Sequence, residues 1–366
     1  MKYHATRVFV CLVLFLGGAA FAAAEDGVRR LLYVTVPDGA GGSKGQGIYI
    51  FDIDDGHKFV RKIEVPDMGG TRGVCASPAT DKIYYAHGNT KLACMDLRSE
   101  KKVWENVYPK NEGGADRIQI TPDGKKLYVP SGWWSSDPYN KVVDAATGKL
   151  ITKIHVSDTG GCHNTIVSLD GKRVYCASTR YTYLTVVDTA TDKIIKRVGP
   201  INNMIWPHTV NGKQTLSFVN VDHVVGFEVC DLQTGKKLHS VLVKGMEDQR
   251  RRCHGIGMTP DETEIWLVDQ DAKRHYIFDN TVMPPVEKGH VDVSAKTHGW
   301  ITFSMDGAYA YPDSGDVIDA KTKKTLTRLR DADGEPVMSS KFIEIHFRGK
   351  DAIRVGQQMG MGMVGE

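Results

Sequence analysis

A unit of about 45 residues recurs along this chain of 366 residues, and the recurrence restricts the fold more than any other feature. Each unit has a hydroxyl-containing turn, such as Ser168-Leu-Asp-Gly171, between two short apolar runs. The turns begin at Ser77, Thr121, Ser168, Thr259 and Ser304, in steps of 44, 47, 91 and 45 residues. The step of 91 residues spans two periods, with a degenerate turn at Val210-Asn-Gly212. A period near 45 with four short strands per repeat is typical of β-propeller blades.

Seven first strands can be counted, and the two chain ends together supply the last blade. The first strands start near Arg72, Asp116, His163, Met204, His254, His298 and Lys341. No complete blade follows Lys341, but Leu31–Val36, Gly47–Ile53 and Phe59–Val65 have the alternation of second, third and fourth strands. The sequence therefore predicts an all-β, seven-bladed propeller with four antiparallel strands per blade and one blade shared between the termini. Asp351–Val355 is left as an unassigned extra strand.

Three stretches carry a family resemblance. Tyr33-Val-Thr-Val36, TPDGKKLYV at 121–129 and VVDTAT at 186–191 resemble the YVTN-type, YncE-like seven-bladed propellers of exported bacterial proteins. The resemblance covers nearly the whole mature chain and implies the same fold. Relatives of this architecture include surface-layer repeats, lactonases and metal-dependent lyases, so the resemblance does not choose a chemistry.

The N-terminus has the pattern of a secretory signal peptide. Lys2 and Arg7 precede an apolar run at Val8–Leu16, and small residues continue to Ala24. The run is shorter than the ~20 residues that a membrane helix needs. We therefore expect a signal at 1–24, a propeller at 25–356 and a flexible Met/Gly-rich tail at 357–366. The protein would be periplasmic or secreted, monomeric and without a membrane span.

Charge and cysteine content exclude some functions. Without Lys2 and Arg7 the chain has 45 basic and 44 acidic residues, which gives no electrostatic case for binding nucleic acid. Six cysteines remain after signal removal, at spacings that match no small disulfide scaffold. We expect at least two of them to be buried free thiols.

The start of each first strand should face one mouth of the central channel. The loops between second and third strands open on the same face, whereas the Asp-Gly turns lie on the opposite face. His163 and His254 are each preceded by a cysteine, and neighbours on a strand point to opposite faces, so only one of each pair can face the channel. The candidate ligand-binding residues at this mouth are Arg72, Asp116, Arg117, Trp133, Trp134, His163, Arg180, Tyr181, His208, His254, His298 and Lys341.

Several interpretations of this mouth remain open. His163, His254 and His298 could hold a divalent transition metal, since neutral imidazole suits such ions. Aromatic rings beside Arg and His are also typical of an organic-ligand site. Polar residues that only line a water-filled channel would give the same pattern.

Three functions are consistent with these residues. The first is an exported propeller that binds a small ligand or a protein partner at its mouth. The second is a lactonase or metal-assisted lyase acting on a carbohydrate or organic acid, with Arg72 and Lys341 holding a carboxylate and Asp116 or a histidine as base. The third is electron transfer or copper handling through the Cys-His pairs and the Met-rich tail. The sequence does not decide whether the protein is an enzyme.

Overall fold

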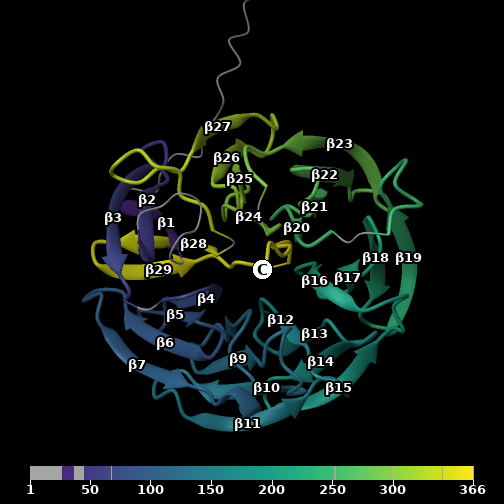
Figure 1. Cartoon of the computed structure of the whole chain (residues 1–366), viewed down its shortest axis with the longest axis horizontal. Helices are drawn as coiled ribbons and strands as arrows, with labels where there is room; N and C mark the ends of the chain where they lie inside the picture. Colours follow the sequence, from purple (N-terminus) through teal and green to yellow (C-terminus); the bar gives the residue numbers. More distant parts are fainter. Residues whose placement is uncertain are drawn as a thin grey trace, which may run out of the picture.

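The computed structural model describes residues 27–36, 45–66, 68–250, 253–296, 298–339 and 341–365. Within these ranges, 29 strands form seven sheets arranged in a ring, with one short 3-10 segment, η1 (Lys110–Glu112) (Figure 1). The seven-bladed propeller predicted from the repeat is therefore confirmed. The predicted signal at 1–24 lies outside the described residues.

Each blade is a sheet of antiparallel strands that runs from the channel to the rim. The closing blade contains β28 (Phe342–Arg348), β1 (Val28–Val36), β2 (Gly47–Asp52) and β3 (Lys58–Glu64). The second blade contains β4 (Thr71–Ser77), β5 (Lys82–His87), β6 (Lys91–Asp96) and β7 (Lys102–Val107). The third contains β8 (Gln119–Ile120), β9 (Lys126–Pro130), β10 (Tyr139–Asp144) and β11 (Leu150–His155).

The remaining four blades follow in chain order. The fourth contains β12 (Cys162–Val167), β13 (Arg173–Ser178), β14 (Leu184–Asp188) and β15 (Lys193–Val198). The fifth contains β16 (Ile205–Val210), β17 (Leu216–Val221), β18 (Gly226–Asp231) and β19 (Lys236–Leu242). The sixth contains β20 (Ile256–Met258), β21 (Glu264–Asp269), β22 (Arg274–Asp279) and β23 (Val286–Asp292). The seventh contains β24 (Ile301–Phe303), β25 (Tyr309–Pro312), β26 (Asp316–Asp319) and β27 (Thr325–Arg328).

The ring closes through pairing of the two chain ends. Strand β28 pairs antiparallel with β1, with Leu31 opposite Ile345, so one blade combines C-terminal and N-terminal strands as predicted. The unassigned segment is β29 (Asp351–Val355), which pairs with β28 and makes this sheet five-stranded. This pairing covers the strand edges that β1 and β28 would otherwise expose.

The repeated turn is an architectural device. In the fourth blade the Ser168 hydroxyl donates to Asp170 Oδ1 at 2.7 Å, and the Arg173 amide donates to Ser168 Oγ at 2.9 Å. Gly171 adopts φ +68°, a left-handed conformation that glycine tolerates best, and donates its amide to the Ser168 carbonyl. Apolar side chains of neighbouring blades pack between the sheets, as Val142 and Val174 do. All six cysteines in the described ranges are buried free thiols.

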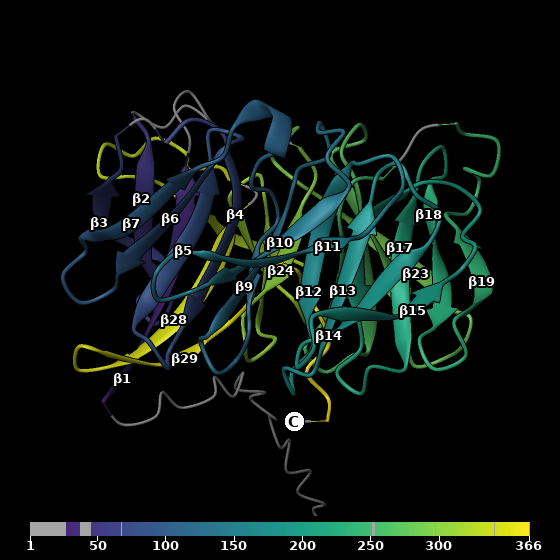
Figure 2. The same ribbon diagram turned by 90° about the horizontal axis from the view of Figure 1, so that it is seen from below.

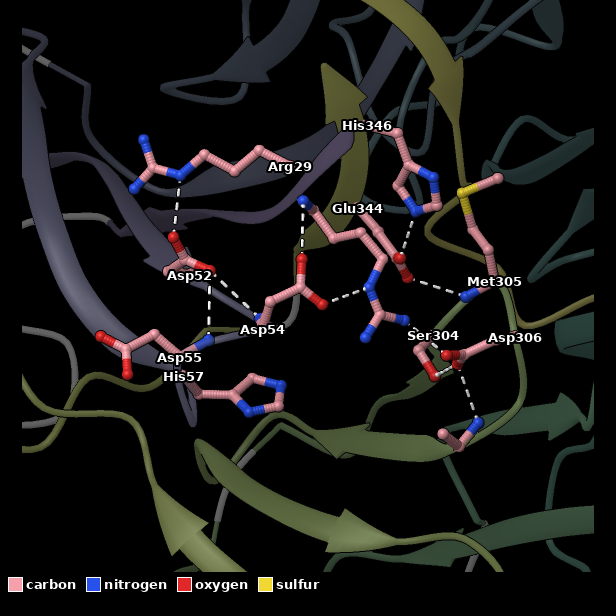
Figure 3. A network of polar contacts seen from close by, with 12 residues as sticks. Arg29, Asp52, Asp54, Asp55, His57, Ser304, Met305, Asp306, Glu344 and His346 are labelled. Carbon is pink, nitrogen blue, oxygen red and sulfur yellow. Dashed lines mark hydrogen bonds and ion pairs between the residues drawn. The ribbon is translucent and has the colours of Figure 1, made fainter. Parts of the chain in front are cut away.

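A polar network joins the closing blade to the seventh blade (Figure 3). The Arg30 guanidinium of β1 donates to Asp54 at 2.7 Å and also forms an ion pair with Asp306, in the turn between β24 and β25. Glu344 of β28 accepts hydrogen bonds from the Met305 amide at 2.7 Å and from His346 at 2.6 Å. These contacts lie on the face of the Asp-Gly turns.

The C-terminal segment differs from the flexible tail that the sequence led us to expect. Gln358, Met359 and Met361 are buried, and the chain ends near the ring axis in Figure 1. The Thr209 hydroxyl donates to the Gly360 carbonyl at 2.7 Å, and the Met258 amide donates to the same carbonyl. Gly360 lies against Gly257, where an added Cβ would lie 3.1 Å from the neighbouring Cα. The small residues that suggested flexibility instead let this segment pass close to the channel wall.

Within the described ranges, no helix is long and apolar enough to span a membrane.

Candidate functional site

Five aromatic side chains from four blades gather at the mouth where the sequence placed a site. We call His163, Trp206, His254, His298 and Trp300 the ring cluster. The His254 ring centroid lies 5.9 Å from that of His163, 5.4 Å from Trp206 and 4.1 Å from His298. All except His298 are buried. First strands or the residues just before them supply every member, so the repeat itself brings these rings together.

In each Cys-His pair the cysteine packs in the core and the histidine faces the channel. Cys162 packs in the core between the third and fourth blades, whereas the ring of His163 lies against Trp206 at 5.9 Å. Cys253 likewise belongs to the core between the fifth and sixth blades, and His254 joins the ring cluster. The imidazoles, and not the thiols, therefore face the channel at this mouth.

Asp116 orients His163. The His163 Nδ1–H donates to Asp116 Oδ2 at 2.7 Å, and both side chains are 1% exposed. Burial would raise the pKa of Asp116, but the adjacent His163 and Arg117 outweigh it and hold that pKa below its usual value. Burial lowers the pKa of His163. The pair is thus a carboxylate and a neutral imidazole, and the lone pair of His163 lies on Nε2.

His254 has the same tautomer. Its Nδ1–H donates to the Gly299 carbonyl at 2.9 Å, which leaves the lone pair on Nε2. Burial, followed by the nearby His298 and His163, lowers the pKa of His254 well below its usual value. Burial of much of the ring and then Arg117 lower the pKa of His298, although part of this residue is exposed. The neutral imidazoles of His163 and His254 therefore lie next to each other, each with Nε2 as a hydrogen-bond acceptor.

Two buried cations share one indole. The Arg117 guanidinium lies 4.2 Å from the ring centroid of Trp300, and the Lys341 ammonium lies 5.4 Å from it. Arg117 donates through Nη1 to the Arg72 carbonyl at 2.7 Å. Burial lowers the pKa of Arg117 to about 10, and the Asp116 carboxylate opposes that shift. We call Arg117 and Lys341 the cation pair.

Several polar atoms at this mouth are buried without a hydrogen-bond partner among the described residues. They are Nε2 of His163 and of His254, Oδ1 of Asp116 and Nε of Arg117. A buried polar atom without a partner costs about 1–3 kcal/mol. Such atoms are uncommon in folded proteins, and several in one place indicate a site that a ligand or ordered water completes.

The other predicted residues lie around this centre or apart from it. Trp133 and Trp134 contact edge to face at 6.0 Å on the rim, where the Trp133 amide donates to Asp116 Oδ2 at 3.3 Å. The Arg72 guanidinium stacks on Trp134 at 4.9 Å. His208 of β16 is buried deeper in the wall, and burial lowers its pKa to about 3.

Arg180 and Tyr181 do not join the ring cluster in the way the sequence suggested. Arg180 is exposed and donates to the Thr159 carbonyl at 3.3 Å. The Arg197 guanidinium, from the outermost strand β15, covers the Tyr181 ring at 4.9 Å. This loop therefore bends toward the rim of its own blade.

Sequence reasoning did not identify Trp300. It lies just before β24, two residues after His298, and its ring centroid is 6.1 Å from that of His254. Its Nε1–H donates to the carbonyl of Gln358 at 2.8 Å, so the C-terminal segment supports it from below.

The proposed metal ligands are not arranged as a metal centre. Among the residues that the structure describes, no group of three or more His, Cys, Asp or Glu side chains could hold a metal ion. We therefore derive no chemistry through a metal at His163, His254 and His298.

No protein-family model matches the chain, and no curated protein matches it either.

Proposed function

We propose that this propeller binds a small hydroxylated organic acid at the ring cluster. The observation that carries the proposal is the group of buried atoms without partners, His163 Nε2, His254 Nε2 and Arg117 Nε, next to the cation pair. A carboxylate satisfies the cations, and hydroxyl groups donate to the two imidazole nitrogens. The Trp206 ring beside His163 and His254 suits the carbon skeleton of such a ligand.

Binding of D-gluconate, with the neutral polyol sorbitol as its matched probe, tests this proposal by isothermal titration calorimetry. We expect gluconate to bind and sorbitol to bind at least about tenfold more weakly, because one charge-assisted hydrogen bond contributes about 1.5–3 kcal/mol. Arg117→Gln and Lys341→Gln should weaken gluconate binding, whereas Lys324→Gln, an exposed residue of the seventh blade, should not. Equal affinities for gluconate and sorbitol, or no binding of either, would overturn the proposal.

A second function rests on the Asp116–His163 hydrogen bond. A neutral histidine held by a carboxylate is the arrangement of a general base. In lactone hydrolysis, His163 Nε2 would take a proton from water as the water oxygen attacks the carbonyl carbon. The cation pair would stabilise the oxyanion. The ring C–O bond would then break, and the proton would pass from His163 to the leaving alkoxide.

Hydrolysis of D-glucono-1,5-lactone, followed by base consumption at constant pH, distinguishes a lactonase from a binding protein. A lactonase should lose most of its activity in His163→Gln and in Asp116→Asn. Denaturation curves of both variants report whether they still fold. Wild-type protein that binds gluconate without accelerating hydrolysis is a binding protein only.

We also propose that the protein is exported and related to the YVTN-type, YncE-like propellers. The signal pattern at 1–24 and the motifs at 33–36, 121–129 and 186–191 support this. Mass spectrometry of the mature protein after cell fractionation tests it. A mature N-terminus just after Ala22 or Ala24 is expected, and an intact Met1 in the cytoplasmic fraction would contradict export.

A further inference from the structure

A cavity of about 260 Å³ lies at the opposite end of the channel from the ring cluster. Its walls come from the turns after the first strands, from β29 and from the C-terminal segment; Pro78, Pro122, Leu169, Pro260 and Met305 belong to the turn wall. Figure 2 shows β29 and the C-terminal end on the same side of the disc. No residue of the ring cluster or the cation pair lines this cavity, which we call the lower pocket.

The lower pocket is mostly apolar. Ile120, Phe303 and Val355 contribute to its wall, together with methionines from β20, from the β24–β25 turn and from the C-terminal segment. Methionine side chains are flexible and polarisable, and they contact aromatic ligands favourably. An engineered apolar cavity of about 150 Å³ in another protein binds benzene, so the lower pocket can hold a single ring with a short side chain.

The Arg354 guanidinium places a positive charge at this pocket. Arg354 is the one charged residue among the residues that line it, and it is exposed. In the described part of the chain its guanidinium forms no ion pair or hydrogen bond. In two of the turns that line the pocket the carboxylate accepts a hydrogen bond within its own turn: the Ser168 hydroxyl donates to Asp170 and the Ser304 hydroxyl donates to Asp306. An apolar wall with an unpaired cation at its edge complements an amphipathic anion.

The C-terminal segment forms one wall of this pocket and is held there by hydrogen bonds. The Thr302 hydroxyl donates to the Gln357 carbonyl at 3.0 Å, and the Met363 amide donates to the Pro260 carbonyl at 3.0 Å. Together with the Gly360 bonds described above, these contacts fix Met361 and Met363 at the pocket. The pocket is therefore enclosed by ordered main chain on the tail side.

We propose that the lower pocket is a second binding site, which takes a small monocarboxylate on a single aromatic ring or short alkyl chain. The ring lies against the methionine and proline side chains, and the carboxylate pairs with Arg354. This site is independent of the function proposed for the ring cluster.

Binding of 3-phenylpropionate to the full chain labelled with 13C at the methionine methyl groups tests the proposal. We expect saturable shifts of the Met305 and Met361 methyl signals, assigned through Met→Leu variants. The signal of Met204, at the opposite mouth, should not move. Shifts confined to Met204, or no saturable shift at all, would overturn the proposal.

Two pairs of variants separate charge from shape. Arg354→Gln should weaken 3-phenylpropionate binding about tenfold, the loss of one charge-assisted hydrogen bond, and leave binding of neutral 3-phenylpropan-1-ol unchanged. Lys350→Gln removes the same charge from the same hairpin without touching the pocket and should change neither.

Ile353→Trp should fill the pocket and abolish binding of both compounds, whereas Ile195→Trp, on the outer strand β15, should not. Equal loss in Arg354→Gln and Lys350→Gln, or full binding in Ile353→Trp, would contradict the assignment.

Discussion

Acidification is expected to destabilise this protein before most of its carboxylates titrate, because histidines are buried in their neutral form. Burial lowers the pKa of His57 to about 4, of His208 to about 3 and of His275 to about 4. In the unfolded chain the same imidazoles have pKa values near ~6.5. The unfolded state therefore binds protons at a pH where the folded state does not, and this difference favours unfolding.

The size of the effect follows from these pKa values. Above pH ~6.5 neither state is protonated at these sites, so their full contribution to stability is present. At pH 5 each of these histidines lowers the free energy of unfolding by about 2 kcal/mol relative to neutral pH. His57, His208 and His275 together lower it by about 6 kcal/mol. The loss continues until the pH reaches the folded-state pKa values. The lowered pKa values of His163 and His254 add to it in the same direction.

Urea denaturation at pH 7.5 and pH 5.0 measures this loss as a difference in the free energy of unfolding. In His275→Gln the difference should shrink by about 2 kcal/mol, because one neutral buried imidazole has been removed. His290→Gln, at an exposed position of β23, should leave the difference unchanged. A free energy of unfolding that is equal at the two pH values would refute the reasoning.

Three further perturbations test the architecture through the free energy of unfolding. Arg30→Gln should cost about 1–3 kcal/mol, because it leaves two partly buried carboxylates without their shared cation, whereas Lys58→Gln, in an exposed pair, should cost less than ~0.5 kcal/mol. Gly160→Ala and Gly245→Ala share φ +78°, but only at Gly160 would the Cβ meet main chain, at 2.5 Å, so the first should cost about 1–3 kcal/mol more than the second. Removal of residues 357–366 should lower the melting temperature and abolish binding at the lower pocket; an unchanged melting temperature would contradict the burial of this segment.

The repeat made the fold predictable because a propeller uses the same turn in every blade. The hydroxyl-to-carboxylate bond seen at Ser168 and Asp170 recurs at Thr121 and Asp123, so the period could be counted without any contact between blades. Ring closure could also be predicted, since an unfinished blade at one end matched unpaired strands at the other.

The site was predictable only where the repeat controls position. His163 and His254 lie at the mouth because each stands at the same place before the turn of its blade. The loop that carries Tyr181 has no fixed place in the repeat. Its contact with Arg197 depends on β15, the outermost strand of the blade. Trp300 precedes β24, where strand alternation does not apply, and a search for one residue per blade does not find it.

The path of the C-terminal segment could not be predicted from the sequence. It is held by hydrogen bonds to polar groups that the strand pairing within the blades does not use. The Gln358 side chain accepts from the Val74 amide at 3.2 Å and donates to the Ile118 carbonyl at 3.0 Å, and its own carbonyl accepts from Trp300. Without the segment, these main-chain groups of the second and third blades would face the channel. Hydrogen bonds of this kind have no periodicity in the sequence, unlike the strand pattern.

Gln358 lies between the two proposed sites. Its amide bridges the second and third blades beneath Trp300, so the buried side chain lies between the ring cluster and the lower pocket. The two proposed sites present different groups: Arg117 and Lys341 over an indole at one end, and Arg354 beside methionine and proline side chains at the other. No residue of the ring cluster or the cation pair lines the lower pocket, so the two proposals can be tested, and can fail, separately.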